Sequence, residues 1–232
     1  MERIESLFTM EDVNEVNAQK VFSDIANDLC KNCCIVQGNV TYEFLEVEFY
    51  YWSEKHQDNK TIYDRNKQPI TKPLVYKRRN DQPGRFLIHS SGIDICFGTE
   101  NENCYGGMLI RTLLRTDKDG NKTVVMGPWD CCDAIINYTG GSSDIHTRII
   151  KKEPQNPLVD LKETIRCNLP KGCNFDDKEY GFYNKAYYSK EKDCWKYNDI
   201  DLERYDTNTM GIKPMKSIPK SWKPWTRQKN EN

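Results

Sequence analysis

Apolar and polar side chains alternate along residues 45–51, where the chain reads Leu-Glu-Val-Glu-Phe-Tyr-Tyr. Because successive side chains of a β-strand point to opposite faces, this pattern predicts a strand with Glu46, Glu48 and Tyr50 on one face. The residues expected behind them, in a hydrophobic core, are Leu45, Val47, Phe49 and Tyr51. Such a polar row is either an ordinary solvated face or one wall of an active site, where partial burial would raise the pKa of a carboxyl group.

Apolar residues recur at helical spacing upstream of this strand. They are Val16, Val21, Phe22, Ile25, Ala26, Leu29 and Cys33. The segment Thr9-Met10-Glu11-Asp12 resembles a capping box, so we expect a long amphipathic helix to follow it and to end near Cys34. Strands over 34–36 and 41–51 are expected next, with Gly38-Asn39 as the turn between them.

Further strands are expected downstream of a long polar segment. Residues 85–97 are strand-like with an interruption at Ser90-Ser91-Gly92, and residues 108–114 form another strong strand. Residues 117–121 have the composition of a turn. Residues 151–205 are charged and rich in tyrosine, and they predict short strands at most.

A second helix is expected to begin at Gly127-Pro128, because proline is favoured at the first helical position. Its core side is predicted to hold Trp129, Cys132, Ile135 and Ile136. Gly140-Gly141 is expected to end it.

Together these elements predict an α+β fold, with a curved mixed or antiparallel β-sheet flanked by helices. The 232 residues are expected to form a single domain over 1–232. Within it we expect an N-terminal arm over 1–14, a long surface loop over 53–84 and a basic tail over 213–232. Long loops of this kind often carry function.

The formal net charge of −1 excludes the strongly basic composition of many nucleic-acid-binding proteins. Contact with a phosphate backbone must therefore come from local patches. The candidates are Lys77, Arg78 and Arg79 in the loop, and Lys220 and Lys223 in a tail that also holds Trp222 and Trp225. We find no secretory signal and no apolar run of membrane-spanning length, so we expect an intracellular protein of the cytoplasm, nucleus or nucleoid with no membrane partner.

The chain has ten cysteines, three of them in the run Cys30-x-x-Cys33-Cys34. A structural zinc site needs four ligands, and the downstream pair Cys167 and Cys173 is spaced too widely for a zinc knuckle. Cys30 and Cys33 also fall on the apolar face of the predicted helix. We expect core thiols and no metal, with a zinc site as the less favoured alternative.

Four short motifs occur in an order that matches a known family. They are Glu48-Phe49-Tyr50 on a strand, Leu109-Ile110-Arg111 closing another, Gly127-Pro128 opening a helix, and Gly211-Ile212 followed by Trp222 and Pro224. In this order and spacing the chain resembles the alkyladenine (3-methyladenine or methylpurine) DNA glycosylases, as a divergent member. The resemblance extends over most of residues 15–227.

The resemblance implies a DNA N-glycosylase that excises alkylated or otherwise modified bases in base-excision repair. Glu48 would be the catalytic base that activates a water to attack the N-glycosidic carbon, a reaction that requires no metal or other cofactor. Tyr50 would stack on the flipped base, and Arg111 would hold a phosphate, a strand end or Glu48 itself. Glu46 would support the site without touching substrate. The implied partner is double-stranded DNA that carries a damaged base.

The chain departs from the family in the segment that supplies its stacking and wedge aromatics. The corresponding stretch is Phe86-Leu87-Ile88-His89-Ser90-Ser91-Gly92, in which His89 would be the stacking group and Ser91 stands where the wedge would be. Two alternatives to a DNA glycosylase therefore stay open. One is an N-glycosidase that acts on a small nucleoside or nucleotide, and the other is a non-catalytic binding protein on the same fold.

Overall fold

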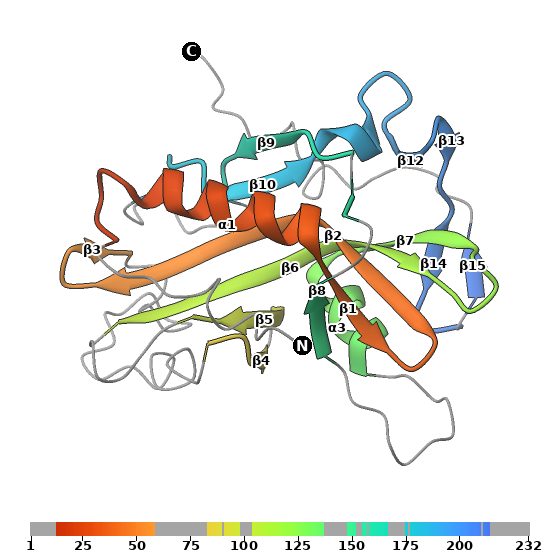
Figure 1. Ribbon diagram of the computed structural model, residues 1–232, viewed down its shortest axis with the longest axis horizontal. Helices are drawn as coiled ribbons and strands as arrows, with labels where there is room; N and C mark the ends of the chain where they lie inside the picture. Colours follow the sequence, from red (N-terminus) through yellow and green to blue (C-terminus); the bar gives the residue numbers. More distant parts are fainter. Residues whose placement is uncertain are drawn as a thin grey trace.

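The computed structural model describes residues 13–58, 83–89, 91–97, 104–136, 148–151, 155–156, 158–166, 175, 177–209 and 211–213. This part of the chain forms an α+β structure in which a curled, largely antiparallel sheet resembles half of a barrel (Figure 1). The α+β class and the curved sheet are as predicted. The prediction of a single domain over 1–232 stays a prediction.

The described helices are α1 (Ala18–Asn32), α3 (Pro128–Ile136) and the 3-10 turn η3 (Lys185–Tyr187). The strands of the large sheet are β1 (Cys33–Gln37), β2 (Val40–Ser53), β3 (His56–Gln57), β4 (Phe86–His89), β5 (Gly92–Cys96), β6 (Tyr105–Thr116), β7 (Lys122–Met126), β8 (Arg148–Lys151), β9 (Leu161–Thr164), β10 (Gly181–Asn184), β14 (Arg204–Asp206) and β15 (Gly211–Lys213). A smaller sheet contains β11 (Tyr188–Ser189), β12 (Cys194–Tyr197) and β13 (Ile200–Asp201).

Strands β2 and β6 form a long antiparallel ribbon along the middle of the sheet (Figure 1). The other edge of β2 pairs with β1, then β10 and then β3, and the other edge of β6 pairs with β5 and β7. The ribbon therefore carries side chains that meet neighbours from five shorter strands. The order β15-β14-β7-β6-β2-β1-β8 describes the sheet from edge to edge.

A pair of β-bulges interrupts the ribbon near its centre. The register runs from Phe44 opposite Leu113 to Val47 opposite Ile110, with Glu46 opposite Thr112 between them, so Leu45 is an extra residue on β2 and Arg111 an extra residue on β6. The alternation of side chains therefore changes phase at this point. The prediction that Leu45 shares a core with Val47 was wrong, because the bulge turns Leu45 to the opposite face.

The larger hydrophobic core lies between one face of the sheet and both α-helices. Phe22 of α1 stacks on Phe49 of β2 with 4.8 Å between ring centroids, and Cys131 and Ile135 of α3 are buried in the same core. The second, smaller core contains Leu45. Its other buried members are Leu114, Val124, Met126, Tyr183, Tyr187, Tyr188, Trp195 and Leu202.

Helix α1 is confirmed but begins later than the apolar spacing predicts. Asn14 Oδ1 accepts hydrogen bonds from the backbone N–H groups of Val16 and Asn17, and Asn17 Oδ1 accepts one from Asn14 N–H. These bonds hold a turn ahead of Ala18, so Val16 is 95% exposed and does not belong to the apolar face. The expected capping box at residues 9–12 lies outside the described residues.

Helix α3 begins at Pro128 as predicted, but its buried face was partly misassigned. Trp129 and Ile136 are 50% and 46% exposed, whereas Cys131, Cys132, Ala134 and Ile135 are buried. The core side is thus centred between 131 and 135 and does not extend to either end of this short helix. The expected stop at Gly140-Gly141 lies outside the described residues.

The predicted hairpin and strands are largely confirmed. Gly38 has a φ of 55° in the turn between β1 and β2, which is the left-handed conformation that favours glycine there. Strands β4 and β5 pair on either side of the expected interruption, β6 covers 108–114, and the described residues of 151–205 contain only short strands. Strand β7, which follows the turn at 117–121, was not predicted.

The start of the expected surface loop over 53–84 is partly buried. Strand β3 folds back onto the end of β2 and brings His56 and Asp58 to 0% exposure. Residues 59–82, with Lys77, Arg78 and Arg79, lie outside the described residues, as does the tail from 214 with Lys220 and Lys223. In the described part of the chain, no helix is both long and apolar enough to cross a membrane.

Candidate active site

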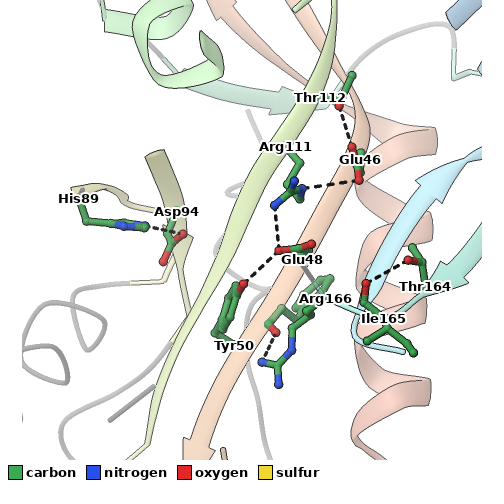
Figure 2. Close-up of polar contacts among 11 residues, drawn as sticks. Glu46, Glu48, Tyr50, His89, Asp94, Arg111, Thr112, Thr164, Ile165 and Arg166 are labelled. Atoms are coloured by element: carbon green, nitrogen blue, oxygen red, sulfur yellow. Dashed lines mark hydrogen bonds and ion pairs between the residues drawn. The ribbon is translucent and has the colours of Figure 1, made fainter. Parts of the chain in front are cut away.

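The polar face of the β2–β6 ribbon holds the cluster that the alternation of residues 45–51 predicted. Glu46, Glu48 and Tyr50 come from β2, and the bulge on β6 places Arg111 and Thr112 beside them (Figure 2). In a regular strand Arg111 and Thr112 would point to opposite faces. The irregular register is therefore what allows both side chains to contact the β2 carboxylates.

Glu48 receives two hydrogen bonds on the same carboxylate oxygen. The Tyr50 hydroxyl donates to Glu48 Oε2 at 3.0 Å, and Arg111 Nη1 donates to the same atom at 3.3 Å (Figure 2). Glu48 is 0% exposed, Arg111 is 4% exposed and Tyr50 is 6% exposed. The low local dielectric strengthens both contacts, and Arg111 compensates a negative charge that would be costly to bury alone.

Arg111 also reaches the second carboxylate of the row. Its Nε lies 3.6 Å from Glu46 Oε1, and Thr112 Oγ1 donates to Glu46 Oε2 at 2.8 Å. One guanidinium thus faces two buried carboxylates. The pKa of Tyr183, which lies opposite Glu46 on β10, is raised chiefly by burial and further by Asp160 and Glu46.

A second buried ion pair lies next to Tyr50, at two residues that were not predicted as site residues. Arg166 Nη1 donates to Asp58 Oδ2 at 2.5 Å and to the carbonyl of Phe49 at 3.1 Å, and both charged side chains are 0% exposed. The centre of the guanidinium lies 4.8 Å from the centroid of the Tyr50 ring. Both residues fall just outside regular strands, Asp58 in the expected surface loop and Arg166 in the charged, tyrosine-rich segment 151–205, so no periodic pattern marked them.

His56 lies in the aromatic core beside this pair. Its Nδ1 is 2.9 Å from the carbonyl of Tyr51, so Nδ1 carries the proton, and its Nε2 accepts from the Tyr180 hydroxyl at 2.9 Å. The ring stacks on Phe175 with 4.6 Å between centroids. Burial lowers the pKa of His56, which keeps the imidazole neutral.

His89 is held at the edge of the same sheet face by a buried carboxylate. His89 Nδ1 accepts the backbone N–H of Ser91 at 3.2 Å, so its proton sits on Nε2 and is directed to Asp94 Oδ1 at 2.9 Å (Figure 2). Asp94 is 0% exposed and lies opposite Leu109, which in turn lies opposite Glu48. Two strand spacings separate the Cα atoms of Asp94 and Glu48, or about 10 Å.

The structure therefore brings together four of the predicted site residues, Glu46, Glu48, Tyr50 and Arg111, and places His89 on β4, three strands from β2. Asp94 was missed, although the alternation of Ile93, Asp94 and Ile95 could have placed it on the polar face. Among the described residues, no three or more His, Cys, Asp or Glu side chains form a group that could hold a metal ion. Cys30, Cys33 and Cys34 are buried, as expected of core thiols.

The cluster combines a buried carboxylate, a phenol and a guanidinium. A carboxylate in such a setting can accept a proton from water and can stabilise positive charge that develops nearby. Compared with models of known protein families, the chain matches none, and a search of curated proteins also finds no match.

Proposed function

We propose that this chain is a DNA N-glycosylase, a divergent relative of the alkyladenine DNA glycosylases with a glycosylase-like fold. The observation that carries the proposal is the Glu48 carboxylate, held by Tyr50 and Arg111 in the middle of a curled sheet. These are the three residues to which the family resemblance assigns the catalytic base, the stacking ring and the adjacent arginine. The fold class and the order of the motifs also support the proposal.

In the proposed reaction a water attacks the sugar carbon while the bond to the damaged base breaks. Glu48 takes a proton from this water and faces the oxocarbenium charge that develops on the sugar. Arg111 compensates the negative charge of Glu48, and the Tyr50 hydroxyl fixes one carboxylate oxygen. Neither role requires a metal or another cofactor.

The burial of Glu48 sets a condition on this mechanism. Because Glu48 is 0% exposed, a substrate can reach it only if the side chains that cover it move aside. The flipped base must also find a free ring face on Tyr50, because Arg166 already covers one face. We expect His89, on the same side of the sheet, to provide the opposite wall.

The proposed partner is double-stranded DNA with a damaged base. Lys77, Arg78, Arg79, Lys220 and Lys223 are the proposed contacts to its phosphates. Release of counterions from these contacts would make the affinity fall with salt concentration.

The complete burial of Glu48 favours a second candidate, a binding protein without catalysis. In that case the cluster of Glu46, Glu48 and Arg111 would serve only to specify the register of the ribbon. The small Ser91 at the wedge position favours a third, an N-glycosidase on a free nucleoside or nucleotide, which needs no wedge.

The test is base release from an alkylated duplex, with the undamaged duplex and the matching free nucleosides as parallel substrates. The proposal predicts abasic sites in the alkylated duplex only. It also predicts that the affinity for the duplex falls with salt, with a slope of log affinity against log salt concentration that corresponds to several phosphate contacts. Release from nucleosides alone would replace DNA with a small substrate. Binding without release from any substrate would favour the non-catalytic candidate.

A further inference from the structure

The buried ion pair of Arg166 and Asp58 is not explained by stability alone. Both side chains are 0% exposed, so each charge has lost its hydration. Buried ion pairs of this kind are often no more stable than apolar residues of similar volume, because their attraction barely repays the desolvation. A pair in this position therefore points to a role in the geometry around it.

Arg166 contacts β2, the strand of the candidate catalytic residue, at two places. Nη1 donates to the carbonyl of Phe49, the residue between Glu48 and Tyr50, and the guanidinium lies over the Tyr50 ring at 4.8 Å. Tyr180, directly before β10, lies beside the same guanidinium, with 5.3 Å between the ring centroid and the guanidinium centre. Arg166 thus restrains both the backbone and the ring of the residue that hydrogen-bonds to Glu48 (Figure 2).

Asp58 and the Phe175 carbonyl also hold the Arg166 guanidinium in place. Nη1 and Nη2 lie 2.5 Å and 3.4 Å from the two Asp58 oxygens, and Nη2 donates to the Phe175 carbonyl at 3.2 Å. Burial by itself would lower the pKa of Arg166, but Asp58, Tyr50 and Glu48 outweigh burial and raise that pKa. The guanidinium is therefore a permanent, immobile charge beside Tyr50.

We infer that Arg166 and Asp58 form a positioning pair, which fixes the Tyr50 ring and through it the hydrogen bond to the Glu48 carboxylate. The inference rests on the proposed function insofar as it assigns the pair a part in base excision. Arg166 acts through Tyr50 and does not touch the reacting atoms. Its planar fork suits this role, because Nη1 and Nη2 together reach Phe49, Asp58 and Phe175 while the guanidinium lies over the Tyr50 ring, a geometry that a lysine ammonium does not reproduce.

The test is a double-mutant cycle of Arg166→Lys and Tyr50→Phe. Each variant is followed in two ways: by NMR of the labelled Glu48 carboxyl carbon across pH, and by kcat and KM for base release. Arg166→Lys retains the positive charge, so a change in Glu48 reports the lost positioning and not the lost charge. The exposed pair Lys192 and Asp201 supplies the control, as Lys192→Arg should change neither readout.

We expect each single variant to raise the pH at which Glu48 ionises and to lower kcat about tenfold, with KM changed by less than about twofold. The double variant should match Tyr50→Phe, because both changes remove the same hydrogen bond. Additive effects in the double variant, or an unchanged Glu48 titration in Arg166→Lys, would overturn the inference. The two substitutions can have the expected non-additive effect on the Glu48 titration while neither the natural chain nor any variant releases a base. That outcome would uphold the positioning pair and reject the glycosylase.

A second variant covers the case in which Arg166→Lys does not fold. The combined change Arg166→Met with Asp58→Asn removes both charges together, so neither is left buried alone. We expect this variant to keep the circular dichroism of the natural chain and still to show the higher ionisation pH of Glu48. A folded variant with an unchanged Glu48 titration would overturn the inference.

Discussion

Arg111 contacts two buried carboxylates at once. This bridge supplies the positive charge that compensates them on the buried polar face of the ribbon. Its Nη1 and Nε face Glu48 and Glu46 respectively, and all three side chains are at most 5% exposed. Removal of one partner from a buried ionic group leaves uncompensated charge, which is far more costly than the net contribution of the intact group. Substitution of Arg111 should therefore lower the free energy of unfolding as well as the activity.

We predict that Arg111→Met destabilises the fold by about 3–5 kcal/mol at pH 7. The loss arises because Glu46 and Glu48 are left buried without a compensating cation. Urea unfolding at pH 7 measures it. The exposed Arg85 gives the control Arg85→Met, which should change stability by less than about 0.5 kcal/mol. A loss no larger than that of Arg85→Met would contradict this view of the bridge.

His56 should make stability depend on pH in the slightly acidic range. Burial lowers the pKa of His56 in the folded state, whereas in the unfolded chain it titrates near its ordinary value of about 6.5. The unfolded state then binds more protons, so stability is fully present above that pH and is lost as the pH falls toward the folded pKa. Unfolding measured from pH 7.5 to 5 should show a flatter profile in His56→Gln, and an unchanged slope would refute the assignment.

Among the secondary-structure elements, the sequence predicted the positions of the strands better than the contacts between side chains of different segments. The alternation of residues 45–51 located β2 and its polar row, but no local pattern revealed the extra residues Leu45 and Arg111. A bulge depends on the pairing of two distant strands, and the sequence of one strand does not contain it. For the same reason Arg166 and Asp58 were missed, because they meet β2 only through tertiary packing.

Helix α1 offers a direct test of where its apolar face begins. The spacing predicted that Val16 and Phe22 both face the core, whereas the structure exposes Val16 and stacks Phe22 on Phe49. We predict that Phe22→Ala costs about 3–5 kcal/mol of unfolding free energy, since it empties a core site. Val16→Ala should cost less than about 0.5 kcal/mol, and similar losses in the two variants would contradict the observed start of α1.

At the scale of the whole molecule, the two helices cover one face of the sheet and leave the row of Glu46, Glu48 and Tyr50 on the other. The sheet thus separates a large apolar core from a polar cluster that is itself enclosed. The α+β class followed from element order and is confirmed, while the glycosylase fold and the DNA partner are proposals. Because the chain is nearly neutral, any contact with DNA must come from local basic patches.

Single-turnover base release from an alkylated duplex by the natural chain and by Glu48→Gln tests Glu48 as the catalytic base most directly. Glu54 lies exposed in the turn just after β2, and Glu54→Gln is the matched control. We predict that the natural chain and Glu54→Gln release the base, and that Glu48→Gln is slower by about 10²–10⁴-fold while remaining folded. Equal release by the natural chain and a folded Glu48→Gln would contradict the assignment of Glu48 as the catalytic base.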